Sequence, residues 1–345
     1  LWMTATRGFD PSPNKPIKAD TGVAPCRAAP GLWMTAIVSQ FDTAHTAPIL
    51  DTQLDDLGLR LATASEDGLV KLWDVSAEDP LFLCDLDGHS GPVHQVAWAP
   101  VGTGAGALLL TGGSDGRVLL WGPCQDPKRW QIVHEENLSK HGEVRALSWA
   151  PTNVGAAFAC ALSDGTVTAT IHQGTVRSGE TDVEHRWQTQ SFAIHKGEVH
   201  AVSWASSVGP DSRGKLAGAC LASAATDGLR VWSILEVQGR SKQEAVDDSE
   251  NKEFRDVAWK PWDGNYDTLA SVKGHEVIFW CRDKSSKWVV ESRVDLEEEV
   301  WHLEWQAGSQ LLVTCGTKEY RSILLKQQLS GKWDKIDLSG EVTAQ

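Results

Sequence analysis

Apolar and polar residues alternate with a period of two over short runs along most of the chain. Examples are RLATAS at residues 60–65, LFLCDL at 81–86 and WVVESRV at 288–294. Alternation of this kind predicts half-buried or fully buried β-strands. Because no segment shows a convincing 3.6-residue period, the pattern predicts an all-β protein.

The strand pattern belongs to a repeat. The stretch SEDGLVKLW at 65–73 returns as SDGRVLLW at 114–121. Six rows share this plan, each with an apolar strand, a second strand, a turn and a third strand, and they span residues 42–75, 88–121, 141–170, 195–232, 254–280 and 299–325. The tryptophans that end the first strand of rows two to six are Trp98, Trp149, Trp204, Trp259 and Trp305, which are 51, 55, 55 and 46 residues apart. A period of more than about 40 residues with Trp-ended strands is typical of four-stranded propeller blades. The fourth strand of each blade is expected in the less regular linkers, such as 81–86 and 288–294.

Composition narrows the function classes. The chain has 46 acidic against 32 Lys and Arg residues, a formal net charge of −14, and no run of four basic residues, which disfavours direct binding of nucleic acid. Its seven cysteines are scattered without a C-x-x-C pair, as expected for reduced thiols in the cytosol or nucleus. No window of 18 consecutive apolar residues predicts a membrane span.

The first 33 residues lack hydrophobic periodicity and are rich in Pro, Gly and Ala, so we expect a disordered leader. LWMTA at 1–5 recurs at 32–36, which favours a duplicated or read-through leader with the natural start at Met34. A transit peptide is the alternative. The expected organisation is therefore a leader at 1–33, one propeller at 34–340 and a tail at 341–345.

A polar pair recurs in three rows, with a His before the first strand and an Asp in the D-G turn before the third: His89 with Asp115, His141 with Asp164, and His195 with Asp227. We expect each pair to meet and satisfy polar groups within its own blade, and the turn glycines to allow a positive φ. The alternative, metal ligands or general bases, requires groups that converge on one point, whereas these occur one pair per blade. No phosphate-binding loop is present either. The sequence therefore predicts no catalytic residue, no metal, no cofactor and no small-molecule substrate.

Rows with this pattern are WD repeats, and the strings RLATASEDGLVKLWDV, GHSGPVHQVAWAP, LSWAPTNVGAAFACALSDG, HAVSWA, FRDVAWKP and EVWHLEW resemble, in this order, the Sec-thirteen family, the propeller subunit shared by the COPII outer coat and the nuclear-pore Y-shaped complex. The resemblance covers about residues 34–335. It extends to Thr170 in place of a row-ending Trp and to the long insert after Trp204. Row five departs from the pattern, with Gly274 where the turn Asp is expected.

The resemblance implies a non-enzymatic scaffold for export from the endoplasmic reticulum to the Golgi. It would lie in the cytoplasm on the vesicle coat at the endoplasmic-reticulum membrane, and at nuclear pores. Contact with the membrane would be peripheral, through the coat. The implied partners are a large α-solenoid coat protein of the Sec-thirty-one type and a Y-complex nucleoporin. The Seh-one-type propeller of nucleoporin and TOR-regulatory complexes is the alternative within the family.

Six rows suggest an open ring. Because WD rings commonly close with seven blades, six leave two unpaired edges that can act as templates for another strand. The resemblance implies that a partner donates the missing blade in trans by β-augmentation. On this interpretation the blade-accepting residues are Pro48, Ile49, Leu50, Leu54, Val300, Leu303, Leu311, Leu312 and Val313. Alternation predicts equally that these residues fill the core.

Two other classes remain open on the sequence. A generic WD peptide-reading adaptor would have a closed ring, which residues 326–345 together with the AIVSQF segment at 36–41 would have to complete. A propeller enzyme would need acidic or histidine clusters over the central channel. The densest acidic segments, HEEN at 134–137 and DLEEEVWH at 295–302, are better explained as solvated surface.

Overall fold

The computed structural model describes residues 41–77, 79–102, 107–126, 128–177, 183–205, 219–234, 241–247, 253–261, 267–282, 287–306, 310–316, 321–328 and 330–338. The expected leader at 1–33, the tail at 341–345 and all of AIVSQF except Phe41 lie outside these residues. The described part consists of 24 strands and two short 3-10 turns, Ser139–His141 and Thr152–Val154. It contains no helix long and apolar enough to cross a membrane.

The strands form six antiparallel four-stranded sheets, which we call blades one to six in chain order. Blade one comprises β1 (Ile49–Leu54), β2 (Arg60–Ser65), β3 (Leu69–Asp74) and β4 (Leu81–Asp87). Blade two comprises β5 (Val93–Trp98), β6 (Leu109–Gly113), β7 (Arg117–Pro123) and β8 (Trp130–Asn137). Blade three comprises β9 (Val144–Trp149), β10 (Ala157–Leu162), β11 (Thr166–Arg177) and β12 (Val183–Ala193).

Blade four comprises β13 (Val199–Trp204), β14 (Ala219–Ala225), β15 (Gly228–Ile234) and β16 (Ser241–Asp247). Blade five comprises β17 (Val257–Trp259), β18 (Thr268–Lys273), β19 (Glu276–Arg282) and β20 (Trp288–Asp295). Blade six comprises β21 (Val300–Gln306), β22 (Gln310–Cys315), β23 (Arg321–Gln327) and β24 (Trp333–Asp337). The six predicted rows are therefore six blades, and the fourth strands lie in the linkers, as predicted.

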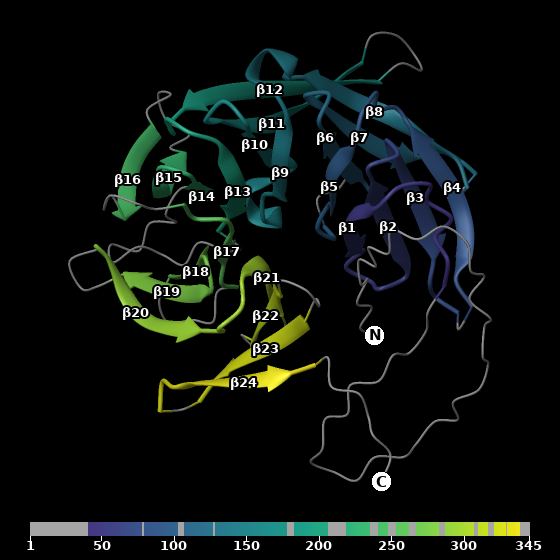
Figure 1. Ribbon diagram of the computed structural model, residues 1–345. Coiled ribbons are helices and arrows are strands. Elements are labelled where there is room, and N and C mark those ends of the chain that lie inside the picture. Colours follow the sequence, from purple (N-terminus) through teal and green to yellow (C-terminus); the bar gives the residue numbers. More distant parts are fainter. Residues whose placement is uncertain are drawn as a thin grey trace, which may run out of the picture.

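The blades follow one another around a centre, with the first strand of each blade innermost and the fourth outermost (Figure 1). Neighbouring inner strands pack side by side from β1 to β5, β9, β13, β17 and β21 in turn. No packing of this extent joins β21 back to β1. In Figure 1 no described strand fills the sector between blade six and blade one. The protein is a six-bladed WD-repeat β-propeller, and among the described strands the close packing of neighbouring inner strands does not continue from blade six to blade one.

Five apolar cores join consecutive blades, and each takes side chains from both neighbours. In the core between blades five and six, for example, the Phe279 ring stacks on Trp333 with the ring centres 4.0 Å apart. A sixth, smaller cluster lies on blade one alone, where Leu61, Trp73 and Val75 pack with Phe41 and Leu54. A blade thus buries its faces against its neighbours, as a repeat protein requires.

Glycine is required at the D-G turns. Gly116 and Gly165 have φ of +70° and +92°, a conformation that other residues rarely adopt. A Cβ on Gly116 would also lie 2.5 Å from the carbonyl oxygen of Gly142, at the start of the next blade. These turns therefore need glycine both for their own shape and for the approach of the neighbouring blade.

Candidate functional site

Burial along the second strand distinguishes blade six from other blades. In β6 and β10 every residue is buried, and β2 and β18 are buried at all but one terminal residue. In β22 burial alternates, with Leu311, Val313 and Cys315 buried and Gln310, Leu312 and Thr314 partly exposed. The buried set packs against blade five. Blade six therefore has one partly exposed face without a neighbouring blade, whereas blade one, at the other end of the series, covers β2 with its own small cluster around Trp73.

This arrangement divides the predicted blade-accepting residues. Four of them have buried side chains in the core with blade five: Val300, Leu303, Leu311 and Val313. The alternation alone left open whether these residues fill the core or meet a partner, and the structure places them in the core. Leu312 belongs to the uncovered face of blade six.

The predicted residues of blade one lie on or beside β1, on the other side of the sector. Ile49, Leu50 and Leu54 are half-buried, and Leu54 belongs to the small cluster around Trp73. Pro48 is exposed and precedes the strand, and its carbonyl oxygen accepts the N–H of Glu66. The structure thus places Leu312 and the blade-one residues on the two sides of the sector, and their contact with a partner remains a prediction.

Blade one also carries an unsatisfied indole on this side. Trp121, Trp232 and Trp280 donate Nε1–H to a hydroxyl of their own blade, on Thr111, Ser223 and Ser271 respectively. The corresponding Trp73 packs edge-on against Phe41, with the ring centres 4.9 Å apart. Its Nε1 is buried and has no hydrogen-bond partner among the residues that the structure describes. A buried N–H without a partner is costly, and at this position of the repeat blade one differs from blades two, four and five, where the indole is satisfied.

Side chains of one inner strand bind the main chain of the next at every join from blade one to blade six. The residue just before the strand-ending position accepts the N–H of the Trp in the next blade in three cases: Gln53 from Trp98 at 2.6 Å, Ser148 from Trp204 at 3.1 Å and Ser203 from Trp259 at 3.0 Å. The residue two places earlier accepts an N–H in three cases: Asp51 from Val96 at 3.0 Å, Gln95 from Leu147 at 2.5 Å and Asp256 from Leu303 at 2.7 Å. These bonds fix the register of each blade on its neighbour.

In blade six the same two positions are His302 and Glu304. His302 is turned back to blade five, with its Nδ1 2.9 Å from Asp256. Desolvation lowers its pKa, but the carboxylates of Asp256, Asp51 and Glu304 outweigh this effect and raise the pKa to about 9. The Glu304 side chain is exposed, and its carboxylate makes no hydrogen bond or ion pair in the described part of the chain, although its charge acts on His302 and Asp51. Of the two acceptor positions of blade six, one therefore holds the protonated ring of His302, and the other holds the Glu304 carboxylate, to which no described N–H donates.

The charges of Asp51 and His302 shift each other's pKa, although the two residues lie on the first and last inner strands. Burial raises the pKa of Asp51, while the N–H of Val96, the charge of His302 and the N–H of Thr52 lower it. The two inner strands that border the sector, β1 and β21, thus carry Asp51 on one side and His302 with Glu304 on the other.

Contacts between a basic side chain and a glutamate form a second series at the start of the inner strands, two of them through arginine and two through histidine. Four pairs join neighbouring blades: His94 with Glu143 at 4.0 Å, Arg145 with Glu198 at 2.5 Å, His200 with Glu253 at 3.6 Å and Arg255 with Glu299 at 2.8 Å. In blade six the corresponding residue is Trp301, which is 42% exposed. Arg255 lies over the Trp301 ring at 4.3 Å. The series of ion pairs therefore ends at an exposed aromatic side chain on the edge of blade six.

The structure brings each predicted His–Asp pair together within its own blade. His89 lies 3.1 Å from Asp115, His141 2.7 Å from Asp164 and His195 2.5 Å from Asp227. Burial lowers the pKa of His89 and of His195, against the raising effect of their aspartates. The second ring nitrogen of each binds a hydroxyl, on Thr111 and Ser223 respectively. These groups are paired locally, which fits the structural interpretation.

A fourth pair, in blade one, was not predicted from the sequence. His45 lies 2.9 Å from Asp67 and 2.8 Å from the Thr63 hydroxyl, in blade one. The signal was present, because His45 precedes its D-G turn by nearly the same spacing as His141 precedes Asp164. In blade five, where Gly274 stands in the turn, His275 pairs with Asp295 at 2.8 Å on the surface instead.

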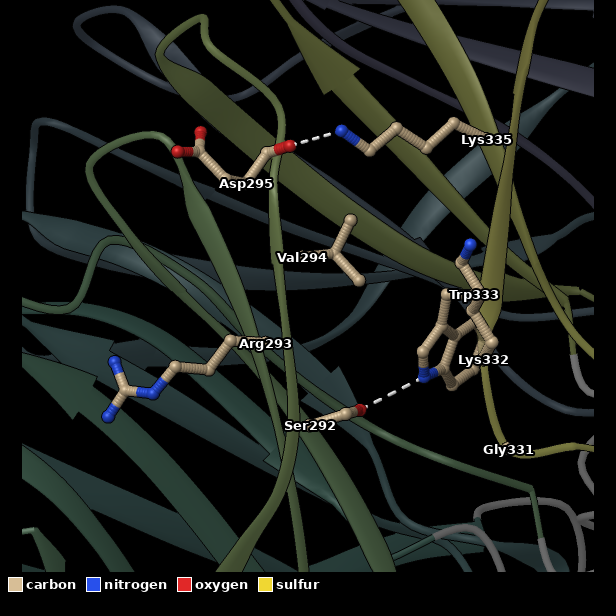
Figure 2. A pocket seen from close by; sticks show the side chains of 8 residues that line it. All are labelled: Ser292, Arg293, Val294, Asp295, Gly331, Lys332, Trp333 and Lys335. Carbon is tan, nitrogen blue, oxygen red and sulfur yellow. Dashed lines mark hydrogen bonds between the residues drawn. The ribbon is translucent and has the colours of Figure 1, made fainter.

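The outer strands of blades five and six border a cleft lined by residues of 292–295 and 331–335 (Figure 2). Trp333 Nε1–H donates to the Ser292 hydroxyl at 3.0 Å, and Lys335 Nζ donates to the carbonyl oxygen of Asp295. Both bonds cross from β24 to β20, so this cleft lies where blades five and six are joined. It shows how the outer strands meet when a blade has a neighbour.

Comparison with known proteins agrees with the repeat structure. The family model described as WD domain, G-beta repeat, matches residues 37–74 and 81–122. Over 317 residues the chain is 27% identical to a Drosophila melanogaster protein named "Protein SEC13 homolog", covering 88% of this chain and 84% of that protein. It is 28% identical over 354 residues to a Mycosarcoma maydis "Protein transport protein SEC13", covering 86% and 93%.

A third relative is a "Protein transport protein SEC13" from Cryptococcus neoformans, 29% identical over 335 residues and covering 86% of this chain and 95% of the relative. Among solved structures, a crystal structure of Saccharomyces cerevisiae Sqt1 superposes with a TM-score of 0.61 at 14% identity, over 86% of this chain and 76% of that one. The Sqt1 likeness concerns the fold alone. The matched repeats, the six blades and the similarity along nearly the whole length make this chain a WD-repeat propeller that is similar to the SEC13 proteins.

Proposed function

We propose that this chain is a non-enzymatic scaffold subunit of the COPII vesicle coat, in protein export from the endoplasmic reticulum to the Golgi, and that it also serves in the nuclear-pore Y-complex. The single observation that carries the proposal is the uncovered face of blade six, seen in the alternating burial of β22. The names of the relatives, several of which include the words protein transport, support the transport role.

The scaffold would accept a blade from a second protein. An incoming sheet between β21 and β1 would cover Leu312 and its neighbours on one side and the cluster around Trp73 on the other. Burial of this kind supplies apolar area and main-chain hydrogen bonds together, as β-augmentation does. The donor we propose is a large α-solenoid coat protein of the Sec-thirty-one type, or a Y-complex nucleoporin at the nuclear pore. Localisation at the endoplasmic-reticulum membrane and the nuclear envelope would follow from these partners.

The position of the C-terminal strand supports donation in trans. Residues 333–337 form β24, which pairs with β23 as the fourth strand of blade six. This segment is already used, so it does not provide the core of a seventh blade. A closed-ring peptide-reading adaptor would have needed residues 333–337 for its seventh blade, and these residues belong to blade six.

Affinity isolation from the native cells tests the proposal. The tagged chain is purified at moderate salt, and co-purifying proteins are identified by mass spectrometry. We expect near one-to-one recovery of a large α-solenoid protein with a short β-rich segment, and its identity distinguishes the vesicle coat, the Y-complex and a Seh-one-type assembly. Recovery of the chain alone would contradict the scaffold function.

A matched pair of variants shows whether the partner binds at the open sector. Leu312→Asp places a charge on the uncovered face of blade six, and we expect it to abolish co-purification. Val101→Asp changes a side chain of blade two that is 62% exposed, and should leave recovery unchanged. Equal recovery with both variants would place the partner elsewhere on the propeller.

A further inference from the structure

The joins between blades follow one rule of recognition. At each join from blade one to blade six, an oxygen-bearing side chain of the leading inner strand accepts a main-chain N–H of the following one, from one of two positions. The chemistry at these positions varies among carboxylate, amide and hydroxyl, but the acceptor role does not vary. If the rule extends to a seventh inner strand, a side-chain oxygen of blade six should accept a main-chain N–H of that strand.

Only one of the two positions on blade six can follow the rule. The His302 ring is bound to Asp256 and carries a proton at neutral pH, so both its nitrogens are donors. Glu304 occupies the other position, the one that Gln53, Ser148 and Ser203 hold in their blades. Its carboxylate is exposed and has no hydrogen-bond partner in the described part of the chain.

We infer that Glu304 sets the register of the incoming blade, because its carboxylate is placed to accept the main-chain N–H of the residue that takes the place of Trp98 in that blade. This inference rests on the proposed function, since the occupant is a β-blade of a partner protein. A carboxylate accepting a main-chain N–H forms a charge-assisted bond, which is stronger than the hydroxyl bonds at the joins from blade three to four and from four to five.

The start of the same strand adds a second requirement on the partner. Within the ring, a basic residue at this level, arginine or histidine, meets a glutamate of the next blade, as Arg255 meets Glu299. In blade one the position of Arg255 is taken by the apolar Leu50, and in blade two the position of Glu299 is taken by the apolar Pro92. Because blade six presents Trp301, the incoming strand is expected to carry an apolar residue there rather than a glutamate.

The test measures affinity for a co-expressed Sec-thirty-one-type coat protein from the same organism, with three variants of this chain. Glu304→Ala removes the acceptor. Glu304→Gln keeps an acceptor oxygen, as Gln53 provides in blade one. Glu291→Ala removes an exposed carboxylate from the outer strand β20 and serves as the control.

We expect Glu304→Ala to weaken binding about 10- to 100-fold, the effect of one lost charge-assisted hydrogen bond. Glu304→Gln should recover most of this loss, and Glu291→Ala should bind like the parent. The melting temperature of the free chain should change little for Glu304→Ala, because the side chain has no hydrogen-bond partner there and its charge attracts His302 but repels Asp51. Parent-like binding by Glu304→Ala would overturn the inference and leave the scaffold function standing, whereas absence of binding by the parent chain itself would overturn both.

Discussion

Blades five and six are built on the same plan but differ in what covers them. In blade five, the second strand β18 is buried at every residue except its last, because blades four and six lie on its two faces. In blade six, β22 is buried only at alternate residues. The strand chemistry is similar, with apolar residues throughout the middle of both. Blade five has a neighbouring blade on its second face and blade six does not. Blade one also lacks a neighbour on one side, but there the cluster around Trp73 keeps β2 buried. A repeat's own sequence does not show whether it is the last of its ring.

The largest effect is expected from two adjacent residues of β22. Leu311→Ala removes a fully buried side chain from the core with blade five and should lower the free energy of unfolding by about 2–5 kcal/mol. Leu312→Ala, one residue on, removes a side chain from the uncovered face and should cost less than about 1 kcal/mol in the free chain. Urea unfolding of both variants checks the difference. Equal losses would mean that both faces of blade six are covered.

Asp256 gives the counterpart of Glu304 inside the ring. Its carboxylate accepts the N–H groups of Leu303 and Val257 and contacts His302. Asp256→Ala leaves these groups unpaired and should destabilise the free chain by about 1–3 kcal/mol. Thermal unfolding beside Glu304→Ala makes the comparison direct, because the latter should leave the free chain almost unchanged. A stable Asp256→Ala variant would show that these joining bonds are dispensable.

The pH dependence of stability tests the charge on His302. Since its pKa is raised to about 9 in the folded chain, the folded state holds the proton more tightly than the unfolded state. The stabilisation is complete below the unfolded pKa of about 6.5 and is lost as the pH rises through 9. The side chain is 56% exposed, so we expect a loss of only about 1 kcal/mol or less. His302→Asn should flatten this decline between pH 7 and 10, and an unchanged decline would show that His302 is not its source.

The smallest effect is expected at the ion pairs between inner strands. Arg145 lies within ion-pair distance of Glu143 in its own blade and Glu198 in the next, and is 36% exposed. Arg145→Ala should therefore cost less than about 1 kcal/mol, and the difference should shrink at high salt. Melting temperatures at two salt concentrations measure it. A large, salt-independent loss would mean that the ring is held by this charge series rather than by its apolar cores.

Much of the fold could be predicted from the sequence. Strand alternation and the Trp spacing gave the six blades, and LFLCDL and WVVESRV are the outer strands β4 and β20. The His–Asp pairs could be found because both members recur at fixed places in each row. His45 and Asp67 were overlooked although they follow the same spacing.

The candidate site was less predictable. Alternation says that Leu311 and Leu312 point to opposite faces of β22, but not which face meets blade five, since that depends on the direction in which the ring is built. Glu304 resembles any exposed glutamate in the sequence. It stands out only when the six inner strands are superposed and the acceptors of the other blades are seen at its position.

Hydrogen exchange on the free chain and on its complex with the co-purified partner tests the central claim most directly. If blade six and blade one border an open sector, partner binding should slow amide exchange in β1, β21 and β22, and leave β9 and β13, deep within the ring, unchanged. Protection confined to other blades, or strong protection of β22 and β1 in the free chain with no further change on binding, would contradict an open six-bladed ring that a partner completes.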